Sequence, residues 1–159
     1  MKNKIVFLDF DGVVNSPLWA YYPRTNSFRH AYAFPEDGFV NNFQAICWLN
    51  ELYHKCPFDI VITSSWRECQ DKYTCEECLR NGGLFNEIQI IGEIGYGYKR
   101  EVLIKKWIEE NNYQGEYVIF DDEDYYSHDE IRDHLVITNP EFGITHKDYE
   151  KAFLILRRT

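Results

Sequence analysis

The sequence predicts an α/β domain in which a mostly parallel sheet carries helices on both faces. Strand-like apolar runs alternate with helical patterns along the 159-residue chain. The strand-like runs are continuously apolar, as expected of strands that are buried on both faces. No internal repeat, low-complexity tract or linker interrupts the alternation. We therefore expect a single domain over residues 1–159, which is long enough to bury a sizeable core.

Five segments have the composition of strands. They are residues 5–8, 59–63, 88–91, 117–120 and 135–138. Three of them are strongly apolar, the run at 88–91 is weaker, and the last is expected at an edge of the sheet.

Between these strands, apolar residues recur at steps of three and four, which is the spacing of an amphipathic helix. The clearest series is Phe39, Phe43, Ile46, Leu49 and Tyr53. Further helices are expected over residues 68–81, from near Lys99 to Ile108, and over residues 149–156. These helices complete the alternation expected of a parallel sheet.

Residues 16–38 depart from this alternation, because they hold three prolines and six aromatic residues without a periodic pattern. A connection of this length without regular structure is unusual and often functional. Its aromatic side chains and arginines could stack a base and bind a phosphate. The simpler alternative is that they pack the segment onto the body of the domain.

Composition excludes several classes of protein. The 26 acidic residues outnumber the 17 basic ones, and a formal charge of −9 argues against broad coating of DNA or RNA. Five cysteines, an odd number, argue against a closed disulfide framework. No run approaches the roughly 18 apolar residues of a membrane span, and Asp9 and Asp11 interrupt the first apolar run as no secretion signal would. We expect a cytoplasmic protein that does not bind a membrane.

Polar residues of particular kinds follow the predicted strands. Asp9 and Asp11 follow the first strand at a spacing of two, which points both side chains the same way if the strand persists. Gly12 then permits a tight turn. Groups beyond the carboxyl ends of parallel strands share one crevice, where ligands bind.

Three further strand-end features complete a chemical set. Thr63 and Ser64 end the second strand, Asp121 and Asp122 end the fourth, and Lys99 precedes the helix before that strand. Clustered carboxylates repel one another unless a cation or protons intervene, and Mg²⁺ prefers such hard oxygen ligands. One carboxylate could attack phosphorus and another could move a proton, while the metal and the lysine neutralise charge.

The order of these residues resembles a known superfamily. Residues 5–13, IVFLDFDGV, resemble the first motif of the haloacid dehalogenase-like (HAD) hydrolases. Thr63 matches the second motif, Lys99 the third, and Asp121 with Asp122 the fourth. The resemblance covers nearly the whole chain.

Two further runs narrow the resemblance to the small capless HAD domains of Swiss Army Knife RNA-repair proteins. They are TSSWR at residues 63–67 and NPEFGIT at residues 139–145. The resemblance implies a Rossmann-like three-layer sandwich with a minimal cap, the flap at residues 16–38. An open site of this kind admits larger substrates, so the expected partner is a phosphorylated substrate such as a nucleotide or a nucleic-acid end.

The resemblance also implies a Mg²⁺-dependent phosphatase. Asp9 would be the nucleophile that forms an aspartyl-phosphate, and Asp11 the acid and base that serves the leaving group and then water. Asp9, the Asp11 backbone carbonyl and Asp121 would hold Mg²⁺, with Asp122 as a further ligand or acting through water.

The same resemblance implies the groups that bind phosphate. Thr63 and Lys99 would hold the transferring phosphoryl group, with Ser64 as the alternative to Thr63 at the motif position. Arg67 would bind substrate phosphate or form a structural ion pair.

Several alternatives stay open. The chain could be a non-catalytic HAD-like module that binds a nucleotide or a partner, or a metal-dependent nuclease. A phosphorylation receiver is disfavoured, because it resembles a different order of aspartates. Cys75 and Cys78 form a CxxC pair, but one pair is a weak zinc signal, and both residues fit one buried helix face.

Overall fold

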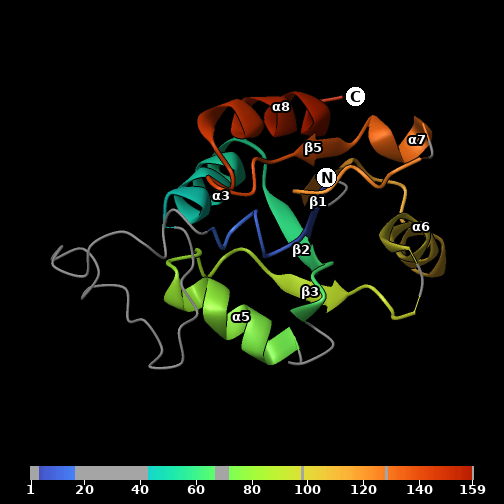
Figure 1. Ribbon diagram of the computed structural model, residues 1–159, viewed down its shortest axis with the longest axis horizontal. Coiled ribbons are helices and arrows are strands. Elements are labelled where there is room, and N and C mark those ends of the chain that lie inside the picture. Colours follow the sequence, from blue (N-terminus) through green and yellow to red (C-terminus); the bar gives the residue numbers. More distant parts are fainter. Residues whose placement is uncertain (1–3, 17–42, 67–71, 98, 128, 159) are drawn as a thin grey trace, which may run out of the picture.

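The computed structural model describes residues 4–16, 43–66, 72–97, 99–127 and 129–158 (Figure 1). Five strands form one sheet in the order β3-β2-β1-β4-β5, and every pairing is parallel. The strands are β1 (Lys4–Leu8), β2 (Phe58–Ile62), β3 (Ile90–Glu93), β4 (Tyr117–Asp121) and β5 (Leu135–Ile137). This order is that of a doubly wound sheet, and the predicted Rossmann-like α/β fold is confirmed.

Strand β1 occupies the centre of the sheet because its apolar residues can be buried on both faces. Val6 and Leu8 enter one buried cluster, whereas Ile5 and Phe7 enter another. Successive strand residues point to opposite faces, so one continuous apolar run supplies both cores.

The helices form a layer on each side of the sheet. Helices α3 (Phe43–Lys55), α5 (Lys72–Asn81) and α8 (His146–Leu156) contribute to the Val6 cluster, and α6 (Arg100–Glu110) and α7 (Asp129–Arg132) to the Ile5 cluster. Figure 1 shows α8 and α3 together on one side and α6 on the other. The molecule therefore has the predicted three layers.

The boundaries differ from the sequence predictions at several elements. Strand β3 begins two residues later than predicted, although Ile88 is fully buried, because the Ile88 N–H donates to the Phe85 carbonyl at 3.2 Å in a turn. Helix α8 begins at His146, since the Asp148 carboxylate accepts a hydrogen bond from the backbone of Thr145 and closes the first turn. The short α7 had no distinct sequence signal.

Part of the predicted structure lies outside the described residues. This is the case for the flap beyond Ser16, for residues 39–42 of the first predicted helix and for residues 68–71 of the second. Within the described ranges, no helix has the length and apolar character needed to cross a membrane.

Candidate active site

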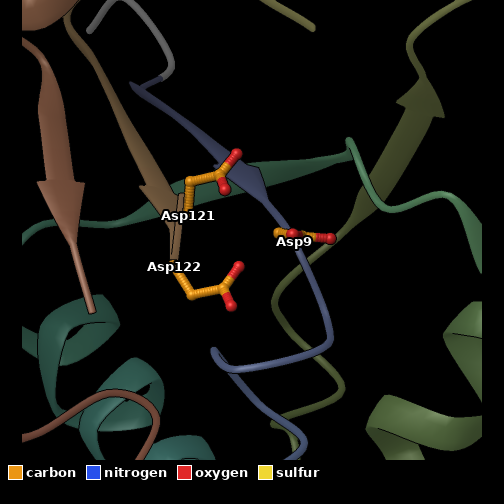
Figure 2. Close-up of side chains that lie close together, drawn as sticks. All are labelled: Asp9, Asp121 and Asp122. Atoms are coloured by element: carbon orange, nitrogen blue, oxygen red, sulfur yellow. The ribbon is translucent and has the colours of Figure 1, made fainter. Parts of the chain in front are cut away.

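Three aspartates meet at the carboxyl edge of the sheet. Leu8 of β1 pairs with Phe120 of β4, so the residues that follow them, Asp9 and Asp121, lie side by side. Asp9, Asp121 and Asp122 each offer an oxygen within 4.8 Å of the others (Figure 2). Asp9 and Asp121 are buried, and Asp122 is half-buried.

Arg100 supplies positive charge to this cluster. Its Nη1 donates to Asp9 Oδ2 at 2.8 Å and also to Asp121 Oδ2. Burial alone lowers the pKa of Arg100, but the two carboxylates outweigh that effect and raise the pKa above its ordinary value. The guanidinium is therefore charged, and one positive group faces two buried negative ones.

Lys99, which was predicted to bind the transferring phosphoryl group, lies exposed at the start of α6. The ion pairs with Asp9 and Asp121 come from its neighbour. The helical period explains the difference, because Arg100 lies three and four residues before Leu103 and Ile104, which face the core. That spacing was a readable signal for choosing Arg100.

Asp9 lies in an environment that disfavours its ionised form. The pKa of Asp9 is raised from its ordinary 3.8 to about 6, mainly because the carboxyl group is buried, and the Asp121 charge contributes to the increase. Arg100, the backbone N–H of Phe10 at 2.8 Å and a hydrogen bond with the Ser64 side chain partly offset this increase. A further cation would therefore favour the ionised carboxylate.

Tyr126 is a buried contact of the cluster that sequence reasoning missed. Its hydroxyl donates to Asp121 Oδ2 at 2.6 Å, and the backbone N–H of Glu123 donates to Asp121 Oδ1 at 3.0 Å. Burial and the Asp121 charge raise the pKa of Tyr126, which keeps the hydroxyl a donor. No pattern distinguishes Tyr126 from the exposed Tyr125 beside it.

Gly12 lets the turn after β1 approach Asp122. Its φ is +68°, and a Cβ at this position would overlap the Asp122 carboxylate. The buried hydroxyl of Thr138 donates to the Gly12 carbonyl at 2.7 Å. Burial raises the pKa of Asp122, and the neighbouring Asp121 adds to the effect.

The other predicted site residues lie at different distances from the cluster. Thr63 is buried at the end of β2, where its N–H donates to the Leu8 carbonyl at 2.9 Å. The Ser64 side chain hydrogen-bonds to Asp9. Asp11 is exposed and is not one of the three clustered aspartates. Arg67 lies outside the described residues.

A family model described as the HAD domain in Swiss Army Knife RNA repair proteins matches residues 5–149. The chain belongs to this HAD family. The match runs from β1 into α8 and so includes the whole sheet and the three aspartates. Comparisons with curated proteins and with solved structures give no significant match.

Membership of the HAD family indicates a phosphatase-type hydrolase, and the buried aspartates could hold a metal ion. Within the described ranges, these three aspartates are the one group of potential ligands that lie close enough together to hold a metal ion. Cys75 and Cys78 instead lie buried in the apolar core, on one face of α5, which is the structural role expected of them.

Proposed function

We propose that the protein is a Mg²⁺-dependent phosphomonoester hydrolase that acts through an aspartyl-phosphate on Asp9. One observation carries the proposal. Asp9 is buried at the carboxyl end of the central strand, beside Asp121, Asp122 and the Arg100 guanidinium, in a chain of the HAD family. Such a carboxylate is a shielded nucleophile with cationic support.

The three aspartates fit a magnesium ion by the chemistry of their donors. Mg²⁺ prefers hard oxygen ligands, and it keeps places for water and phosphate oxygens. Asp9 and Asp121 would hold the ion, Asp122 would act directly or through water, and the Asp11 backbone carbonyl would add a ligand. The bound ion would neutralise charge on the carboxylates and on the phosphoryl oxygens.

In the first step, an Asp9 oxygen attacks phosphorus and the bond from phosphorus to the leaving oxygen breaks. Asp11 donates its proton to that oxygen, so the products are an alcohol and an aspartyl-phosphate. In the second step, Asp11 takes a proton from water while the water oxygen attacks phosphorus. The bond between phosphorus and Asp9 then breaks, which releases inorganic phosphate and restores both carboxyl groups.

The phosphoryl group requires donors around its oxygens. Ser64 and Thr63 come from the end of β2, beside Asp9, and Arg100 approaches from the start of α6. We propose that these residues bind the oxygens of the transferring phosphoryl group. The exposed Lys99 would bind the transferring phosphoryl group together with them, and Arg67 would bind a substrate phosphate.

The proposed substrate is a nucleotide or a nucleic-acid end phosphate in the cytoplasm. The family description refers to RNA repair proteins, and the net charge of −9 favours a nucleotide or a short end over a long duplex. Cys47 and Cys56 are free thiols, in keeping with a reducing compartment.

The first experiment measures hydrolysis of p-nitrophenyl phosphate by the wild type and Asp9→Asn, each with Mg²⁺ and with EDTA. We expect activity only in the wild type with Mg²⁺, and a loss of about 10³-fold or more in Asp9→Asn. The exposed Asp133→Asn is the matched control and should keep full activity. If Asp9→Asn were as active as the wild type, the nucleophile would be assigned wrongly.

One observation favours a second candidate, a non-catalytic module that binds a nucleotide or a partner. Arg100 already neutralises part of the charge on Asp9 and Asp121 without a metal. Such a module would bind nucleotides in equilibrium dialysis but would release no phosphate from them or from 3′- and 5′-phosphorylated oligonucleotides. Turnover on any of these substrates that requires Asp9 excludes it.

A further inference from the structure

The Asp11 carboxylate is held at both oxygens, although the residue is exposed. Trp66 Nε1 donates to Asp11 Oδ2 at 2.8 Å, and Asn15 Nδ2 donates to Asp11 Oδ1 at 2.9 Å. A solvent-facing aspartate that lacked such bonds would sample several rotamers. These two bonds instead fix one orientation of the carboxylate.

Trp66 is itself anchored to the body of the molecule. Its ring packs against the fully buried Phe10, with 5.2 Å between ring centroids, and it covers the edge of the core cluster. Its backbone N–H donates to Ser64 Oγ at 3.2 Å, and the Ser64 side chain also hydrogen-bonds to Asp9. One short segment after β2 therefore contacts Asp9 through Ser64 and Asp11 through Trp66.

We propose that Trp66 is a positioning residue, whose indole N–H fixes the Asp11 carboxylate as the proton carrier of the reaction. Asn15 belongs to the same turn as Asp11, so it moves with that turn. Trp66 comes from a different strand end and ties the turn to the body. Each carboxylate oxygen accepts up to two hydrogen bonds, so a place for the transferred proton remains. This inference rests on the proposed role of Asp11 in phosphate transfer.

The test depends on the leaving group. The p-nitrophenolate ion leaves without a proton, whereas an alkoxide needs one, so only an alkyl phosphate requires the general acid in the first step. The ratio kcat/KM covers the steps up to formation of the aspartyl-phosphate. Trp66→Phe should lower kcat/KM roughly tenfold for an alkyl phosphate, the loss expected from one charge-assisted hydrogen bond. For p-nitrophenyl phosphate, the kcat/KM of Trp66→Phe should stay within about twofold of the wild-type value.

Two variants calibrate this measurement. Asp11→Asn should lower kcat/KM for the alkyl phosphate by about 10²-fold or more. Trp107→Phe is the matched control, because Trp107 packs against Phe7 in the other core cluster. This variant should leave the ratio of the kcat/KM values for the two substrates unchanged. Equal losses on both esters in Trp66→Phe would show a merely structural role and overturn the proposal.

A second readout does not depend on activity or on the folding of Trp66→Phe. In protein labelled with ¹⁵N-tryptophan, Asp11→Ala should shift the Trp66 indole N–H resonance and speed its exchange with solvent, whereas Asp133→Asn should not. An unchanged Trp66 signal in Asp11→Ala would overturn the inference. A wild type inactive on both esters would instead refute the proposed function, and the catalytic role of Trp66 would fail with it.

Discussion

The guanidinium of Arg100 contacts two buried carboxylates, so the charges of Asp9 and Asp121 are only partly balanced. A buried charge that lacks full compensation costs free energy and shifts the pKa toward the neutral form. The raised pKa of Asp9 is the direct sign of this imbalance. In the absence of a metal ion, the residue proposed as the nucleophile therefore destabilises the fold at neutral pH.

The corresponding prediction is that Asp9→Asn stabilises the metal-free protein at pH 7.5. The pKa of Asp9 is about 6 in the folded protein, above its ordinary 3.8, so the folded state binds the proton more tightly. This contribution to stability is present below pH 4 and is lost as the pH rises through 6. Asn removes this loss of stability, which is about 3 kcal/mol at 1.36 kcal/mol for each pKa unit.

Urea unfolding in EDTA at pH 4 and pH 7.5 measures this effect. The stability of Asp9→Asn relative to wild type should rise between the two pH values, while the exposed Asp133→Asn should show no such rise. A difference between Asp9→Asn and the wild type that is the same at both pH values would contradict the prediction.

Helix α6 and the segment after β4 carry two different contacts to Asp121, and Glu101 joins them. Arg100 begins α6, and Tyr126 lies on the segment after β4. Glu101 is 3% exposed, and its carboxylate accepts bonds from Ser127 N at 2.7 Å and Ser127 Oγ at 3.0 Å. The two elements therefore approach Asp121 as one unit.

Replacing Glu101 should loosen that unit. Glu101→Ala removes two hydrogen bonds between a charged carboxylate and Ser127, which should lower the free energy of unfolding by about 2 kcal/mol. Glu101→Gln keeps an acceptor oxygen and should lose less than half as much. Chemical denaturation of the three proteins measures both effects, and equal stability of Glu101→Ala and the wild type would disprove the role of this contact.

Over the whole molecule, the sheet order brings together at one edge carboxylates that are far apart in the chain, Asp9 with Asp121 and Asp122. The net charge of −9 further favours the binding of a cation there. Any ligand that binds only the folded state stabilises it by mass action. The whole fold should therefore respond to a metal ion held at this edge.

We expect Mg²⁺ to raise the melting temperature. At a hundredfold excess over Kd the gain is about 2.7 kcal/mol, which corresponds to roughly 5–10 °C for a chain of this size. Asp121→Asn should abolish most of this gain. A NaCl control at equal ionic strength separates site binding from general screening, and an equal rise with NaCl would contradict a metal site.

Much of the fold was predictable because apolar periodicity is set by local sequence. The continuous runs around Val6, Val61 and Val118 predicted buried parallel strands, and the rule for strand ends then predicted that Asp9 and Asp121 would meet. Both predictions needed only the chain order of the elements. The later start of β3 was not predictable, because Ile88 has an apolar side chain typical of a strand but lies in a turn closed by its bond to the Phe85 carbonyl.

The site was less predictable where it depends on loops. The choice between Lys99 and Arg100 required the helical phase relative to the core, a signal that the sequence contains. The bonds of Tyr126 to Asp121 and of Trp66 to Asp11 depend on loop paths after β4 and β2, which no residue spacing encodes. The roles of Asp11 and Lys99 stay predictions until they are measured.

The position of β1 between β2 and β4 has a consequence for biosynthesis. Ile5 pairs with Asp59 on one side and with Tyr117 on the other, and the Gly12 carbonyl binds Thr138. A ribosome makes the amino-terminal aspartates long before their partners, so the growing chain exposes one edge of its central strand until residue 121 has emerged. The nucleophile proposed here therefore acquires Arg100 and Asp121 late in synthesis, and incomplete chains carry no assembled site.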